Sequence, residues 1–200
     1  MNKVEVDYTD CFAQTMKRMQ KDGLLLVTLG KDGKPNVMTI GWGTIGLVWG
    51  RPIFIVFVRP SRYTYGRLEQ VDQFTVNVPT EQMGKAAEYC GKVSGRDHDK
   101  FKQANLTIVP GKKVKVPVID ECFISYECRV LHTNDLIPDR LSGVVKKEFY
   151  PTRRDDDARR ASDSTSRQVA SQREGDFHRV YFGQILTVYA DLPRTYLSSV

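Results

Sequence analysis

The sequence predicts a mainly β protein, built as an antiparallel β-barrel with a few peripheral helices. Strand-like runs outnumber helical ones, and several connections between them are too short for the crossovers that parallel strands require. A length of 200 residues with 40% hydrophobic and 27% charged content is ordinary for a globular protein. We therefore expect a single domain over residues 1–200, large enough to bury a core.

A helix is predicted ahead of Gly23, a residue type that often ends helices. It begins after Thr9 and Asp10. Apolar side chains recur there at helical spacing: Tyr8, Phe12, Met16 and Met19.

A β-hairpin is predicted next. Leu24–Leu29 is a short apolar run, Lys31–Lys34 is turn-like because it contains Asp and Gly, and Asn36–Ile40 returns as a second strand.

Five later segments are strand-like because they are apolar, β-branched or alternating. Between them we expect one helix from Ser61, as its cap, to about Val71, and another from Thr80 toward Cys90. The strand-like segments are Leu47–Trp49, Ile53–Val58, Phe74–Val78, Cys122–Leu131 and Arg179–Tyr189.

The segment Pro151–Asp176 differs from the rest in composition. Val169 is its one aliphatic residue larger than Ala. Such a segment buries too little apolar surface to offset its ordering entropy, so a mobile loop is the expectation. The alternative is a lid that orders over a ligand or over the other subunit of a dimer.

The net charge of +6 raises the question of nucleic acid as a partner. Within 151–176 the charges of six Arg and six acidic residues cancel, and the excess positive charge is scattered over the rest of the sequence. We therefore expect no nucleic-acid binding. No apolar run approaches the length of a membrane span, so we expect no membrane association and a cytoplasmic location.

The four cysteines lack the spacing of a metal site, and we expect no bound metal. Their predicted role is that of small buried apolar residues rather than of a redox pair. They are Cys11, Cys90, Cys122 and Cys128.

Residues Gly41–Gly46 match the Gly-x-Gly-x-x-Gly dinucleotide fingerprint literally. That fingerprint opens a helix and is followed about twenty residues later by an acidic residue. Here a β-rich segment broken by Pro52 follows, and no Asp or Glu occurs between Gly46 and Glu69. The match is therefore a false positive.

Three segments carry residues suited to a ligand with a flat apolar ring at one end and a phosphate at the other: Asn36–Trp42, Arg59–Tyr65 and Cys90–Phe101. The first is either an ordinary strand with Trp42 in the core, or an apolar wall with donors for a ring. The second supplies guanidinium and hydroxyl groups suited to a phosphate, or is simply a solvated helix start. The third is a surface turn or the opposite wall of an anion pocket.

His178 stands at the start of the last strand, directly after the polar segment. A structural role and a role in the site are both open for this residue. His98 and His132 have no informative context.

Taken together, the Arg-Pro-Ser-Arg-Tyr-Thr segment at 59–64 and the Ser-Gly-Arg-Asp-x-Asp-Lys-Phe segment at 94–101 resemble the flavin reductase-like family, which has the FMN-binding split-barrel fold. The resemblance is to its flavoredoxin branch and spans about 24–132 and 176–191. It implies an antiparallel split β-barrel that forms a homodimer and binds FMN in a groove near the subunit interface.

The resemblance also implies roles for single residues. The isoalloxazine and ribityl chain would contact Asn36, Met38, Thr39 and Trp42. The phosphate side would be held by Arg59, Ser61, Arg62 and Thr64, with Ser94 and Lys100 closing it. A His before the last strand lies near the flavin or nicotinamide in related reductases, which makes His178 the catalytic candidate.

Two classes of function follow from the resemblance. An NAD(P)H-dependent reductase would pass electrons from NADH or NADPH through FMN to free flavin, ferric chelates or a partner oxygenase. A non-enzymatic flavoredoxin-type carrier would exchange electrons with redox protein partners. A third possibility is a flavin-free barrel that serves as an interaction module.

Overall fold

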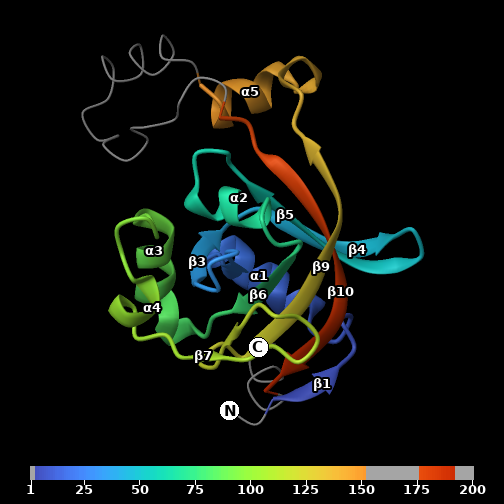
Figure 1. The fold of residues 1–200 in the computed structure, drawn as a ribbon. Helices are drawn as coiled ribbons and strands as arrows, with labels where there is room; N and C mark the ends of the chain where they lie inside the picture. Colours follow the sequence, from blue (N-terminus) through green and yellow to red (C-terminus); the bar gives the residue numbers. More distant parts are fainter. Residues whose placement is uncertain (1–2, 152–175, 192–200) are drawn as a thin grey trace.

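The computed structural model describes residues 3–151 and 176–191, which form one eight-stranded sheet, a two-stranded sheet and peripheral helices (Figure 1). Most of the segment expected to be a loop or lid, residues 152–175, lies outside the described residues. The strands are β1 Val4–Val6, β2 Leu24–Leu29, β3 Pro35–Ile40, β4 Gly43–Val48, β5 Arg51–Val58, β6 Gln73–Val78, β7 Ile108–Val109, β8 Val118–Ile119, β9 Ile124–Asp135 and β10 Arg179–Ala190. The α-helices are α1 Phe12–Lys21, α2 Tyr63–Leu68, α3 Gly84–Lys92, α4 Lys100–Gln103 and α5 Gly143–Phe149, with short 3₁₀ turns at Glu81–Met83 and Pro138–Arg140.

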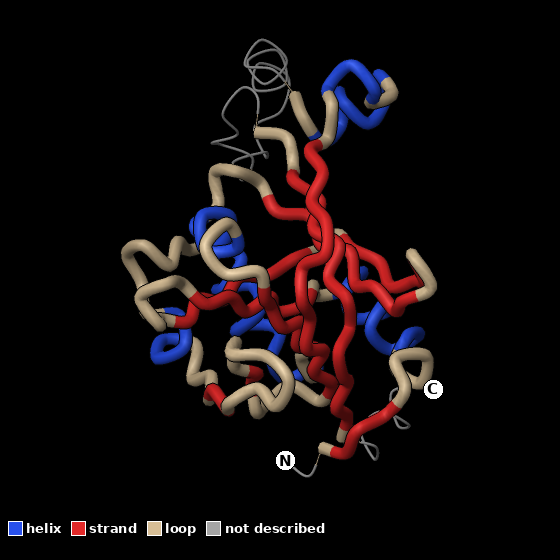
Figure 2. The backbone as a smooth tube through the Cα atoms, turned by 45° about the vertical axis from the view of Figure 1, so that its right-hand side comes forward, coloured by secondary structure: helices blue, strands red, loops and turns tan. Residues whose placement is uncertain are grey.

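The large sheet has the strand order β3-β2-β6-β9-β10-β5-β4, and β1 pairs with β10. Every strand pair in the described part of the chain is antiparallel. The long strands β9 and β10 run through the length of the molecule (Figure 2). The prediction of a mainly antiparallel β fold with a few helices is confirmed.

Strand β2 is buried on both faces, which explains why its sequence is apolar without alternation. Leu24 and Leu26 point into the core within the curved sheet. Leu25 and Val27 point the other way, into a second core against α3, whose Ala87 is fully buried. The predicted hairpin is confirmed, with β3 paired along the whole of β2. This hairpin therefore anchors the end of β3, where the candidate site lies.

The C-terminal strand β10 lies between β9 and β5 and carries irregular pairing at Phe182/Gly183. A Cβ at Gly183 would lie 2.3 Å from the Phe74 ring, so only glycine allows this ring to pack against β10. Because β10 borders β5, its first residues lie beside the end of β5.

Several element boundaries differ from the prediction. Strand β9 covers Ile124–Asp135 rather than Cys122–Leu131, and α3 begins at Gly84, after a 3₁₀ turn, rather than directly after Thr80. Strand β4 begins at Gly43 rather than Leu47, and its turn to β5 places Trp49 and Gly50 at positive φ, as in a tight hairpin. Helix α2 runs over Tyr63–Leu68 and is not capped by the Ser61 side chain, because that hydroxyl donates to a carboxylate elsewhere in the chain.

The four cysteines are buried and unpaired, as predicted for small apolar residues. Among the described residues, no helix combines the length and the hydropathy needed to span a bilayer.

Candidate functional site

Two adjoining cavities lie between the end of β3, the start of α2 and the loop after α3. The first, of about 110 Å³, is called the basic cavity here, and the second, of about 260 Å³, the aromatic cavity. Met38 and Arg62 line both, so the two cavities form one elongated site. Its two halves differ in chemistry, as a ligand with a phosphate and a flat ring requires.

The basic cavity is lined by four cationic side chains, three aliphatic hydroxyls and the Tyr63 phenol, and no carboxylate within the described ranges lines it. This composition favours an anion. Arg62 is exposed and makes no ion pair with any described residue. The cations are Arg62, Lys92, Arg96 and Lys100, and Ser61, Thr64 and Ser94 supply the aliphatic hydroxyls.

Lys100 is the buried cation of this cavity, with 5% of its surface exposed. Its Nζ donates to the carbonyl oxygen of Cys90 over 2.8 Å, and no described carboxylate pairs with it. Burial, aided by the positive charge of Arg62, lowers the pKa of Lys100 to about 8. A buried ammonium without a counter-ion is stabilised by a bound anion.

Asn36 and Thr64 are both buried and joined behind the basic cavity. Asn36 Nδ2 donates to Thr64 Oγ1 over 2.8 Å, which links β3 to α2. A Cβ on Gly95 would lie 2.0 Å from Asn36 Oδ1, so a glycine is needed for the loop after α3 to approach. Thr64 lines the cavity, whereas Asn36 holds it in place from behind.

Ser61 and Arg59 bind the backbone segment that leads into β10. The Asp176 carboxylate accepts hydrogen bonds from Ser61 Oγ over 2.6 Å and from the Ser61 backbone N–H over 2.9 Å. The Arg59 guanidinium donates to the carbonyl oxygens of Asp176 and Phe149, each over 3.0 Å. Both residues line the site, but the hydrogen-bond donors described here bind Asp176 and Phe149.

The aromatic cavity is lined by the end of β3, the end of β5 and His178. Trp42 is 37% exposed, so it is a wall of the cavity rather than the core residue of the alternative interpretation. Its ring lies 4.7 Å from that of His178 and 5.0 Å from that of Phe149. Phe57 and Met38 add further apolar surface.

His178 is buried and its Nδ1 lies 2.6 Å from the hydroxyl of Tyr150. Burial, followed by the positive charge of Arg59, lowers the pKa of His178 to about 3. The imidazole is therefore neutral near pH 7. Thr39 lines the same cavity and donates from Oγ1 to the carbonyl oxygen of Ala87.

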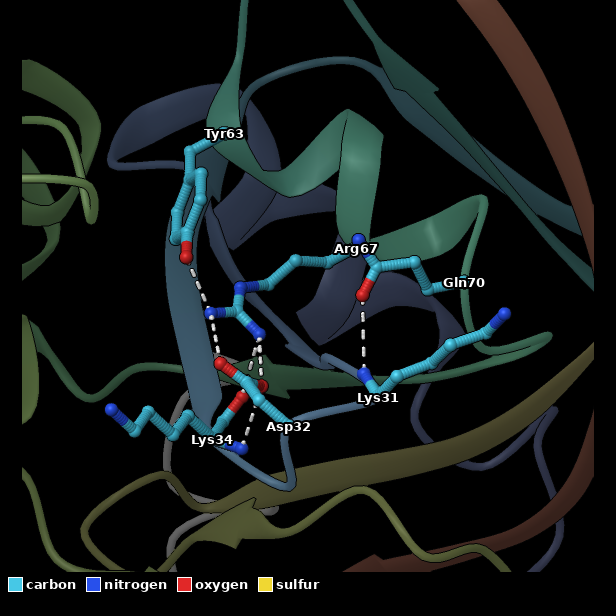
Figure 3. Close-up of polar contacts among 6 residues, drawn as sticks. All are labelled: Lys31, Asp32, Lys34, Tyr63, Arg67 and Gln70. Atoms are coloured by element: carbon cyan, nitrogen blue, oxygen red, sulfur yellow. Dashed lines mark hydrogen bonds and ion pairs between the residues drawn. The ribbon is translucent and has the colours of Figure 1, made fainter.

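Arg67 is a supporting residue that no sequence pattern indicates. It is buried and donates to Asp32 Oδ1 over 2.9 Å and to the hydroxyl of Tyr63 (Figure 3). Hydrogen bonds from Arg67 and from the backbone N–H of Lys34 lower the pKa of Asp32 to about 2. This network fixes Tyr63, which lines the basic cavity, to the β2–β3 turn. An Arg that follows a helix start by a few residues usually faces solvent, so its burial had no sequence signal.

The structure thus brings the predicted site residues together from four separate stretches of the chain. Nine of them line the two cavities: Met38, Thr39, Trp42, Arg59, Ser61, Arg62, Thr64, Ser94 and Lys100. His178 lines the aromatic cavity as well, and Asn36 lies behind the basic cavity. The cavity walls also contain residues that the sequence interpretation did not select, namely Phe57, Tyr63, Lys92 and Arg96. Arg67, Tyr150 and Asp176 support the site and were not selected either.

One family model matches most of the chain. The family model described as flavin reductase like domain matches residues 16–192. A relative from Archaeoglobus fulgidus, described as an uncharacterized protein, is 40% identical over 98 residues, which is 49% of this chain and 55% of that protein. The chain spans about half to three fifths of the curated relatives that it matches.

Solved structures of similar fold carry related descriptions. A flavoredoxin from Methanosarcina acetivorans is 25% identical with a TM-score of 0.59, and the match covers 85% of this chain and 68% of that one. An FMN-binding domain of a flavin reductases-like enzyme from Shewanella baltica is 16% identical with a TM-score of 0.60, covering 96% and 78%. The predicted split-barrel fold is therefore confirmed.

Proposed function

The chain belongs to the flavin reductase like domain family, and on this premise we propose that it binds FMN across the two cavities and acts as an NAD(P)H-dependent reductase. The observation that carries the proposal is the pairing of a basic cavity, which no carboxylate of the described residues lines, with an aromatic one. In the proposed arrangement the phosphate occupies the basic cavity and the isoalloxazine lies against Trp42, Met38 and Thr39.

The phosphate end has a clear division of roles. Arg62 and Lys100 supply positive charge, and the Ser94 hydroxyl supplies a short-range donor. Thr64 is oriented by Asn36, because Thr64 Oγ1 accepts a hydrogen bond from the Asn36 side-chain amide. The remaining donors of this part of the site, those of Ser61 and Arg59, hold the segment at Asp176 and so act on the site indirectly.

At the ring end the protein controls position and access. When bound, FMN supplies hydride acceptance at its N5 atom and one-electron exchange. Trp42 and Phe57 exclude water from one side of the aromatic cavity. His178 stays neutral at physiological pH, so it serves as a hydrogen-bonding group and not as a proton source. Hydride transfer itself needs no general base.

An electron carrier is the second candidate, and the flavoredoxin among the similar structures favours it. Electrons would then pass to and from redox proteins instead of from NADH or NADPH. The absorbance spectrum of freshly purified protein, followed by NADH and NADPH oxidation assays with added FMN, separates the candidates. Turnover with a pyridine nucleotide supports the reductase, whereas reduction by a protein donor alone supports the carrier. Protein that stays colourless and ignores added FMN contradicts both.

A homodimer is part of the same proposal. The β4–β5 hairpin exposes 66% of Leu47 and 59% of Trp49, and Trp49 lies beside His132 and Phe182. Contiguous exposed apolar side chains of this kind are typical of an interaction surface. Light scattering with FMN present should report twice the 22.8 kDa chain mass, and a value near the chain mass contradicts the dimer.

A further inference from the structure

Tyr150 and His178 form a buried hydrogen-bonded pair beside the aromatic cavity. The Tyr150 ring stacks on Phe177 at 4.7 Å, and the Arg59 guanidinium lies 4.9 Å above it. The geometry points to Tyr150 as the positioning residue that fixes the tautomer of His178, so that His178 presents an uncharged Nε2–H donor to the cavity. The identity of the ligand that receives this donor rests on the proposed function, whereas the tautomer does not.

The direction of the hydrogen bond follows from counting donors and acceptors. A neutral imidazole has one N–H group and one acceptor nitrogen. If Nδ1 carried the proton, it would donate to the Tyr150 oxygen, and the phenol proton would need another acceptor. No other acceptor contacts that hydroxyl within the described part of the chain. If Nε2 carries the proton, Tyr150 donates to Nδ1 over 2.6 Å, so the phenol and Nδ1 are both paired, and among the described residues only the Nε2–H is left for a ligand.

The electrostatic surroundings favour the same assignment. Burial raises the pKa of Tyr150, with the Arg59 charge and the backbone N–H of His178 acting in the opposite direction. The phenol therefore keeps its proton. His178 remains neutral because burial disfavours the imidazolium.

The consequence is an uncharged donor beside the aromatic rings of the site, distinct from the charged Arg59 and Arg62 guanidinium groups that line the same cavity. Among the described residues, none accepts a hydrogen bond from Nε2, and His178 lines the cavity together with Trp42, Phe57 and Met38. An uncharged donor in such surroundings selects a carbonyl oxygen on a heteroaromatic ligand. Two ligands of the proposed reaction carry one, namely the isoalloxazine and the carboxamide of a nicotinamide.

Nitrogen NMR of the uniformly labelled full chain tests the tautomer. Long-range proton–nitrogen spectra should show His178 with an unprotonated Nδ1 and a protonated Nε2, and Tyr150→Phe should convert this pattern to a mixture of tautomers. The matched control is Tyr89→Phe, since Tyr89 contacts another histidine, His98, in an exposed setting. A protonated Nδ1 in the wild type overturns the inference. So does a Tyr150→Phe variant that loses thermal stability while keeping the wild-type tautomer.

Binding and reduction measurements then identify the carbonyl. Loss of one neutral hydrogen bond should weaken a ligand by about two- to tenfold. If the acceptor is the isoalloxazine, Tyr150→Phe weakens FMN; if it is the carboxamide, FMN affinity is unchanged and the stopped-flow Kd for NADH rises. If Tyr150→Phe keeps the wild-type affinity for FMN and the wild-type Kd for NADH, the positioning role is overturned. Failure of the wild type to bind FMN contradicts the proposed function instead, and the NMR result still decides the tautomer.

Discussion

The Asp176 carboxylate binds Ser61, two residues ahead of helix α2, accepting hydrogen bonds from Ser61 Oγ over 2.6 Å and from the Ser61 backbone N–H over 2.9 Å. These two residues are 115 positions apart in the chain. The contact fixes the segment that carries His178 against the end of β5. It therefore connects the basic and aromatic halves of the candidate site.

Asp176→Asn should lower the free energy of unfolding by about 1–3 kcal/mol, because hydrogen bonds to a buried carboxylate are stronger than those to an amide. Thermal and urea denaturation measure this change. Asp97→Asn is the control, since Asp97 is exposed in the loop after α3. Equal melting temperatures for Asp176→Asn and wild type would show that the contact does not stabilise the fold.

Arg62→Ala should weaken FMN binding by about tenfold or more while leaving thermal stability nearly unchanged. Its guanidinium is exposed and lines both cavities, so it contributes charge but little packing. A charge-assisted hydrogen bond contributes roughly 1.5–3 kcal/mol, which corresponds to at least a tenfold change in affinity. Arg51→Ala, at the other end of β5, is the control. The assignment fails if Arg62→Ala binds FMN as tightly as Arg51→Ala at the same salt concentration.

FMN affinity should fall by about tenfold between pH 7 and pH 9, because Lys100, whose pKa is lowered to about 8, loses its charge over this range. Fluorescence titration at both pH values measures the change, with riboflavin as the control for titration of the flavin ring. Lys100→Met should remove the pH dependence. A pH dependence that persists in Lys100→Met would assign it to another group.

Gly95→Ala should disrupt the basic cavity, since its Cβ would lie 2.0 Å from Asn36 Oδ1 and 3.1 Å from the Tyr63 ring. We expect reduced thermal stability and FMN affinity at least tenfold below wild type. Gly46→Ala is a matched control, because a Cβ at Gly46 would meet no atom within 4 Å. The packing argument is wrong if the two variants behave alike.

The order of the elements could be predicted from the sequence because local patterns determine them. The β2–β3 hairpin is an apolar run, a turn with Asp and Gly, and a second strand, all within 17 residues of each other. The boundary of β4 was missed because Gly43, Thr44 and Gly46 lack the apolar pattern of a strand, and pairing with β5 determines it instead.

The part of the site that depends on residue types near the ends of strands and helices could be predicted from the sequence. Arg62 and Lys100 stand in segments rich in cations and hydroxyls, which suit a phosphate. The pairing of Ser61 with Asp176 and of Tyr150 with His178 could not be predicted, because each joins residues that only the folded sheet brings together. The same holds for Arg67, whose burial depends on the β2–β3 turn.

Titration calorimetry of the purified chain with FMN and with riboflavin, at one salt concentration and pH 7, tests the central claim most directly. Riboflavin carries the same ring without the phosphate. Binding of FMN that is tighter by about tenfold or more supports a phosphate held by Arg62 and Lys100 beside an aromatic cavity. Equal affinities for the two flavins, or no binding of either, would contradict it.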